Sequence, residues 1–146
     1  MKYPIGIQDF EKIIEDGYVY VDKTELVYKL ANEGHIYFLC RPRRFGKSLL
    51  ISTLKYYFQG RKDLFRGLAI DKLETKWAEY PVFHLSFGSA NFTKHGTLDE
   101  VIDNYLADFE NDYPTNTKPR DFGIRFASIL KAAHKKTGRR AVVLID

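Results

Sequence analysis

The chain has 146 residues, of which 45% are apolar and 29% charged; this is the composition of one soluble domain and excludes a disordered chain. A single cysteine excludes an internal disulfide framework and a multi-cysteine zinc cluster. The net charge of +4 is mild, but basic blocks at 41–47 and 131–140 and an acidic block at 98–113 suit a polyanionic ligand; solvated helix faces produce the same pattern.

The composition also argues against a membrane or secreted protein. No apolar run approaches the roughly 20 residues that span a bilayer. The amino terminus lacks the apolar stretch of a signal peptide. We therefore expect a cytoplasmic protein that has no membrane partner.

Three elements are predicted in the first 34 residues. A shared apolar face predicts a short helix over Asp9–Asp16. Alternating aromatic and β-branched residues predict a short strand over Tyr18–Val21. Thr24 can cap a helix that runs to about Glu33.

The middle of the chain reads as strand, turn and helix. His35–Cys40 is a nearly continuous apolar run, typical of a central strand covered by helices on both faces, and we expect Cys40 to be buried there. A cationic turn follows, and the pattern of Ser48–Phe58 is helical. A helical turn is predicted at Asp63–Leu68 and a second strand at Pro81–Phe87.

The last third predicts two helices and a third strand. Thr97 opens a capping-box pattern before a helix whose apolar spacing continues to Phe109. A second helix begins near Phe122 and is closed by Gly138, and Ala141–Ile145 is an apolar, β-branched strand. Strands separated by helices predict an α/β fold with a mainly parallel sheet.

The turn between the run 35–40 and the helix that follows carries the chemistry. A tight loop at a helix start offers several backbone N–H groups to phosphate oxygens, and the helix dipole adds positive potential. Gly46 lets the backbone approach the phosphates, Lys47 can reach the β- and γ-phosphates, and the Ser48 hydroxyl can ligate Mg²⁺. One departure from the pattern G-x-x-x-x-G-K-[ST] is Arg41, which occupies the position of its first glycine; it strains a left-handed turn, or else the loop enters differently.

Asp146 adds a second element of the same chemistry. It follows the apolar run 142–145, and a carboxylate at the end of a neighbouring parallel strand helps to hold Mg²⁺ in phosphate-loop enzymes. A strand that simply ends in a polar residue is the alternative.

Three segments in this order and spacing closely resemble the bacterial AAA-ATPase-like family: Pro4–Phe10, Tyr18–Thr24 and Arg41–Ser48. Members of that family commonly carry a PD-(D/E)XK nuclease-like domain at the C-terminus. The resemblance implies an incomplete three-layer P-loop NTPase fold, with a lead-in over residues 1–34 and a core over 35–146 that is truncated after the Walker B strand. It also implies DNA as a partner through the missing nuclease-like domain, and a homo-oligomer.

The resemblance and the loop chemistry together predict a site for ATP and Mg²⁺. Catalytic roles fall to Lys47 and Asp146, and Ser48 and Asp146 are the expected metal ligands. The nucleotide-binding residues are Arg41, Pro42, Arg43, Arg44, Phe45, Gly46, Lys47, Ser48 and Leu49. The acid that follows the Walker B aspartate in family members, the sensor residue and the arginine finger are missing here, so we expect ATP binding with little hydrolysis.

Several alternatives stay open. The same loop serves small-molecule kinases, and a loop that has lost ATP would leave a nucleic-acid or protein interaction module. Arg43 and Arg44 can contact phosphates or a partner subunit's nucleotide, or can be solvated cations. The run Asp22–Thr24 can contact the base side of a nucleotide, or can be a helix cap with a surface pair.

Overall fold

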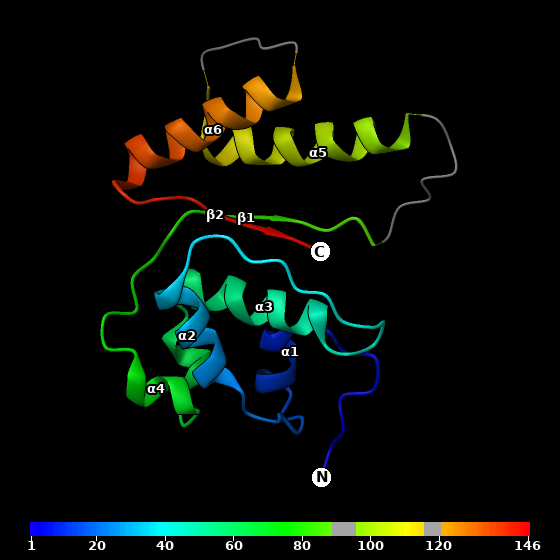
Figure 1. The fold of residues 1–146 in the computed structure, drawn as a ribbon, viewed down its shortest axis with the longest axis vertical. Coiled ribbons are helices and arrows are strands. Elements are labelled where there is room, and N and C mark those ends of the chain that lie inside the picture. Colours follow the sequence, from blue (N-terminus) through cyan, green and yellow to red (C-terminus); the bar gives the residue numbers. More distant parts are fainter. Residues whose placement is uncertain (89–95, 116–120) are drawn as a thin grey trace. The chain divides into compact units, whose positions relative to one another are not determined.

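The protein is described by a computed structural model for residues 1–88, 96–115 and 121–146. These residues form two compact units, Met1–Glu79 (unit 1) and Tyr80–Asp146 (unit 2). Helices make up the regular structure described in unit 1, and unit 2 combines helices with a parallel sheet (Figure 1). The chain is therefore of mixed α/β type, as expected, whereas the predicted lead-in and core at 1–34 and 35–146 stay a prediction.

Unit 1 confirms the helices that the apolar periodicity predicts. The elements are α1 (Phe10–Glu15), α2 (Thr24–Glu33), α3 (Lys47–Phe58), the short 3₁₀ helix η1 (Lys62–Phe65) and α4 (Ala69–Leu73). Asp9 caps α1, because its carboxylate accepts a hydrogen bond from the Lys12 backbone N–H at 3.0 Å. Thr24 does not cap α2 as expected: it is the first helical residue, and no side chain caps this helix.

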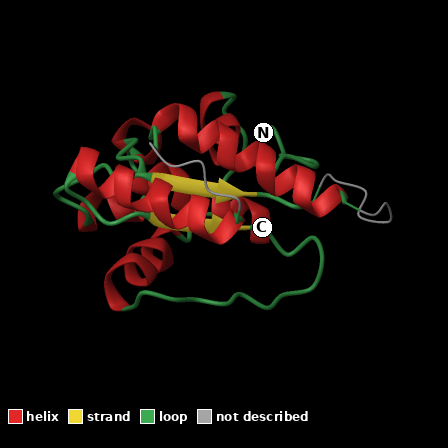
Figure 2. Cartoon of the chain, turned by 90° about the horizontal axis from the view of Figure 1, so that it is seen from above, coloured by secondary structure: helices red, strands yellow, loops and turns green. Residues whose placement is uncertain are grey.

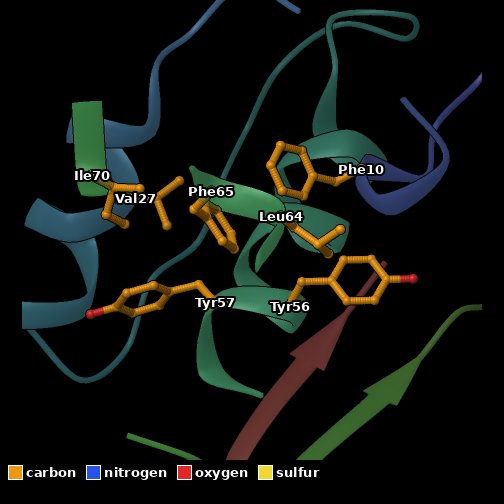
Figure 3. Packing of buried hydrophobic residues seen from close by; sticks show 7 residues of the cluster. All are labelled: Phe10, Val27, Tyr56, Tyr57, Leu64, Phe65 and Ile70. Carbon is orange, nitrogen blue, oxygen red and sulfur yellow. The ribbon is translucent and has the colours of Figure 1, made fainter. Parts of the chain in front are cut away.

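Aromatic and aliphatic side chains from all five helical elements form the core of unit 1. Its buried members are Phe10, Val27, Tyr56, Tyr57, Leu64, Phe65 and Ile70 (Figure 3). The Phe10 and Phe65 rings pack with centroids 4.8 Å apart. Burying side chains of this size contributes about 1.5–3 kcal/mol each. The core thus fixes the helix that follows the predicted phosphate loop.

Two strands predicted in unit 1 are wrong. Neither Tyr18–Val21 nor His35–Cys40 forms a strand; the second segment is the cyan trace that joins α2 to α3 in Figure 1. Ile36 and Phe38 are each 93% exposed, and Cys40 is exposed rather than buried. A strand needs a ladder of hydrogen bonds to a neighbour; Val19 N donates to the Lys2 carbonyl at 2.8 Å, but the sheet among the described residues contains neither segment.

Unit 2 contains a parallel sheet of two strands within its described residues. Strand β1 (Val82–Leu85) pairs directly with β2 (Val142–Ile145), and the two are the yellow arrows of Figure 2. Their register places Val82 opposite Val142. Both strands were predicted, whereas the further strands of a three-layer P-loop fold are not among the described residues. That finer assignment therefore stays a proposal.

Helices α5 (Thr97–Asp112) and α6 (Phe122–Thr137) pack against β1. Their shared core contains the buried side chains of Phe83, Leu106, Ile129 and Ala133. Arg125 of α6 joins the two helices through ion pairs with Asp103 and Glu110 of α5. The partly buried pair with Glu110 uses two nitrogens of the guanidinium, and such bidentate pairs add geometric specificity to the contact between the helices.

The ends of these helices test two further predictions. The capping box is wrong, because Gly96 precedes α5 in the left-handed region at φ +84° and no side chain caps the helix. Gly138 ends α6 as predicted: its φ is +68°, and its N–H donates to the His134 carbonyl at 2.8 Å. Among the helices of the described residues, none has the length and apolar character of a membrane span.

Candidate functional site

The predicted phosphate loop leads directly into α3. Gly46 is the residue before the helix and has φ +73°, which the absence of a side chain permits. No side chain caps α3, and the backbone N–H groups of Lys47, Ser48 and Leu49 donate to no acceptor among the described residues. These three groups point out of the helix start and are available to an anion.

The Lys47 ammonium lies across the loop. Its Nζ donates a hydrogen bond to the backbone carbonyl of Arg41 at 2.9 Å. An ammonium has three N–H groups, so two remain for a ligand. The cation is therefore held at the loop and does not point away from it.

Arg41 occupies the first glycine position of the general pattern without backbone strain. Among the described residues, only Arg44 and Trp77 are non-glycine residues with positive φ. The left-handed positions in the loop are Arg44, at φ +67°, and Gly46, at φ +73°, and Arg41 is not one of them. The loop thus enters differently from the general pattern, which is one of the two outcomes expected from the sequence.

The side chains of the loop are accessible. Residues 41–46 are exposed, and 47–50 are half-buried at the start of α3. Arg43 and Arg44 form no ion pair with any described residue. The Ser48 hydroxyl makes no hydrogen bond within the described part of the chain. The loop therefore presents the unpaired positive charges of Arg43 and Arg44 and a hydroxyl oxygen, that of Ser48, which can ligate a metal.

Hydrogen bonds from α1 hold α3 in place behind the loop. The Phe10 backbone N–H donates to Ser52 Oγ at 2.8 Å, and the Tyr56 hydroxyl donates to the Asp9 carboxylate at 3.1 Å. Desolvation, followed by the neighbouring carboxylates of Glu11 and Asp9, raises the pKa of Tyr56 well above its usual value. Asp9 and Phe10 thus support the helix that begins at the loop.

Asp22 and Thr24 form a second structural contact, which we call the Asp22–Thr24 clamp. The Asp22 carboxylate accepts from Thr24 N at 2.9 Å, from Thr24 Oγ1 at 2.7 Å and from Ala69 N at 2.7 Å. The buried Thr24 hydroxyl in turn accepts from Ile70 N at 3.1 Å. The clamp joins the start of α2 to the start of α4.

The clamp determines the ionisation of Asp22. Burial alone would raise the pKa of this carboxyl, but the hydrogen bonds from Thr24 and Ala69 outweigh it, so the pKa lies below its usual value. Both partners are thus engaged within the protein. This favours the structural interpretation of Asp22 and Thr24 over a contact with a nucleotide base.

A cavity of about 580 Å³ adjoins the loop within unit 1, and we call it the loop cavity. Arg41, Phe45 and Gly46 of the loop line it, together with Tyr20 and residues of α2. Burial, partly opposed by a hydrogen bond with Thr53, raises the pKa of Tyr20. The volume of the loop cavity lies within the roughly 300–1,000 Å³ of small-molecule sites. In the sequence, only the run Asp22–Thr24 pointed to this region, and its Lys23 lines the cavity.

Asp146 lies in the other unit. It is exposed and follows β2; its N–H donates to the Leu85 carbonyl at 2.9 Å, and its carbonyl accepts from Phe87 N at 2.9 Å. These backbone bonds extend the pairing of the two strands and leave the carboxylate to solvent. No described part of the chain holds three or more His, Cys, Asp or Glu side chains arranged for a metal. A shared role of Ser48 and Asp146 stays a prediction.

A helix start whose N–H groups are free, preceded by a glycine-containing turn, is a common anion-binding arrangement. The chain belongs to the AAA-ATPase-like family, described as predicted AAA-ATPase, which it matches over residues 4–146. This confirms the family that the three segments resemble.

One curated relative is an uncharacterized protein in the vnfD 5' region of Azotobacter chroococcum mcd 1. It is 41% identical over 146 residues, an alignment that covers 99% of this chain and 28% of the relative. No solved structure matches the chain. The nuclease-like domain expected from the resemblance is not tested by these similarities.

Proposed function

We propose that this chain is the nucleotide-binding part of an ATPase and that the loop 41–49 binds the triphosphate of Mg-ATP. The observation that carries the proposal is the combination of three unengaged N–H groups at the start of α3 with the Lys47 ammonium held across the same loop. Membership of a family of predicted AAA-ATPases supports it.

Each part of the loop has a distinct task in this proposal. The N–H groups of Lys47, Ser48 and Leu49 donate to phosphate oxygens, and the positive end of the α3 dipole favours the negative charge. The two remaining N–H groups of Lys47 bind the β- and γ-phosphates. Arg43 and Arg44 add positive potential from exposed positions.

The oxygens of Ser48 and Asp146 fit Mg²⁺ by their chemistry. Mg²⁺ prefers hard oxygen ligands, and it is usually held by one or two protein groups together with substrate phosphates and water. The Ser48 hydroxyl has no competing hydrogen bond among the described residues, and Asp146 is exposed. Bound Mg²⁺ would neutralise charge on the phosphates. In this proposal Ser48 and Asp146 keep their oxygens available to the metal.

The test is a calorimetric titration of Mg-ATP into the wild type and Lys47→Ala. Charge-assisted hydrogen bonds contribute about 1.5–3 kcal/mol, so the variant should bind roughly 10–150-fold more weakly. Lys55→Ala is the matched control, because Lys55 lies on the same helix in its last turn. It should leave the affinity unchanged.

Equal affinity of the wild type and Lys47→Ala would refute the proposal. Binding to DNA that weakens steeply with salt and ignores nucleotide would then favour an interaction module.

A further inference from the structure

The charges of unit 2 are segregated by helix. Residues 122–140 comprise α6 and the turn after it, and they contain no acid and six cations: Arg125, Lys131, Lys135, Lys136, Arg139 and Arg140. Helix α5 has the opposite composition, with six acids and no base. Arg125 forms the ion pairs between the two helices that lie in the described ranges. The five later cations pair with no described carboxylate.

Internal contacts account for two of these five cations. Lys136 Nζ donates a hydrogen bond to the Asp112 carbonyl at 3.0 Å, and the Arg139 guanidinium lies 5.3 Å from the centroid of the Tyr80 ring. The other three are exposed, and their side chains form no hydrogen bond or ion pair within the described part of the chain. We call these three residues the basic end of α6: Lys131, Lys135 and Arg140.

The helix dipole explains only one member of this surface. A cation in the last turn of a helix interacts favourably with the unsatisfied carbonyl groups there, and Lys135 is in that position. Lys131 precedes the last turn, and Arg140 lies beyond the end of the helix. Because the dipole effect is confined to the last turn, it does not account for these two cations.

The side chains around the basic end of α6 favour a polyanion over an apolar partner. None of the exposed large apolar residues of the described chain falls between positions 125 and 142. A membrane surface or the apolar centre of a protein interface therefore has no counterpart here. Thr137 carries the one hydroxyl between positions 131 and 140, and it donates to the Ala133 carbonyl within the helix. The accessible groups are point charges, which suit phosphates rather than bases or 2′-hydroxyl groups.

We propose that the basic end of α6 binds the phosphate backbone of double-stranded DNA without reading its sequence. Helix α6 rises about 9 Å between Lys131 and Thr137, and duplex DNA carries one negative charge per roughly 1.7 Å of its axis, so several phosphates lie within reach. The acids of α5 repel a polyanion and confine the contact to α6 and the turn after it. This surface shares no residue with the loop 41–49, so the inference does not depend on the proposed function.

The experiment measures the binding of a fluorescent DNA duplex of about 20 base pairs by anisotropy at several salt concentrations. It compares the wild type with Lys131→Gln/Lys135→Gln/Arg140→Gln. Each phosphate contact contributes about 0.9 to the slope of log K against log salt concentration, so this triple variant should lower the slope by about 2–3. At low salt it should bind the duplex at least about tenfold more weakly than the wild type.

The matched control is Lys62→Gln/Lys72→Gln/Lys76→Gln, which removes the same charge from exposed positions of unit 1. It should keep the slope of the wild type. If the two triple variants weaken DNA binding equally, the effect is one of net charge and the proposal is overturned. A wild type that does not bind the duplex overturns it as well.

Two further arms test the class of partner and the fold of the variant. Polyglutamate of equal charge that binds as tightly as DNA, or duplex RNA that binds more tightly, would overturn the assignment to DNA. If the triple variant does not fold, Arg140→Gln decides, because this residue lies outside the helix. A slope lower by about 1 supports the proposal, and an unchanged slope overturns it.

Discussion

Replacing Thr24 by valine tests the Asp22–Thr24 clamp. Valine has nearly the shape of threonine but removes the hydroxyl, which donates to Asp22 at 2.7 Å and accepts from the Ile70 N–H at 3.1 Å. Thr24 and Ile70 are both fully buried, so no water replaces the lost acceptor. An unsatisfied buried N–H costs about 1–3 kcal/mol. Losing one bond to the more exposed carboxylate adds about 1 kcal/mol.

The expected effect on stability is thus a loss of about 3 kcal/mol, against typical totals of roughly 5–15 kcal/mol. With a denaturant slope of about 2 kcal/mol/M, the urea midpoint should fall by about 1.5 M. Trp77 is the single tryptophan of the chain, and its ring packs 5.2 Å from that of Phe65 in the core of unit 1. Its fluorescence therefore reports the unfolding of unit 1.

Thr24→Ser is the control for this measurement. Serine keeps both hydrogen bonds and loses one methyl group, which costs about 1 kcal/mol. If valine costs no more than serine, the clamp does not stabilise unit 1 and the reasoning is refuted.

Two further predictions concern Asp22 and the loop glycine. Because the pKa of Asp22 is lowered in the folded protein, the stabilisation by its ionised carboxylate is complete above the unfolded pKa near 4 and is lost as pH falls through the folded value. Asp22→Asn should therefore lose less stability than the wild type between about pH 5 and 3, measured by urea titration. An identical loss of stability in both proteins over this pH range would contradict the prediction. Gly46→Ala should lower the free energy of unfolding by about 1 kcal/mol, because its φ is +73°, and should weaken Mg-ATP binding in calorimetry. Gly138→Ala, at φ +68°, should cost a similar amount of stability and leave binding unchanged. Equal affinities of the two variants would argue against binding at the loop.

Helices were predictable from the sequence because their apolar residues follow the helical period. The long helices α5 and α6 each carry a clear apolar stripe, and Gly138 marks the end of α6. Sequence patterns gave wrong predictions where the structure of a segment depends on a neighbour that is distant in the chain. The run His35–Cys40 is apolar enough for a strand, but strands need a paired neighbour, which periodicity does not supply.

The candidate site was predictable only in part for the same reason. The contiguous loop residues Gly46, Lys47 and Ser48 are readable as a motif, and the structure places them at a helix start. The loop cavity is lined by separate segments between Pro4 and Thr53, so no single stretch of sequence predicts it. Nor does the motif reveal that Asp22 and Thr24 bond to each other and to α4.

The bond from Lys47 to the Arg41 carbonyl bears on how rapidly and tightly an anion would be captured. It orients the Lys47 side chain across the turn and so restricts its rotamers. If the loop binds phosphate as proposed, part of the entropy cost of ordering this side chain, on the order of 2 kcal/mol for a lysine, would already be met before binding. Arg41 thereby contributes through its backbone carbonyl, which orients the Lys47 ammonium.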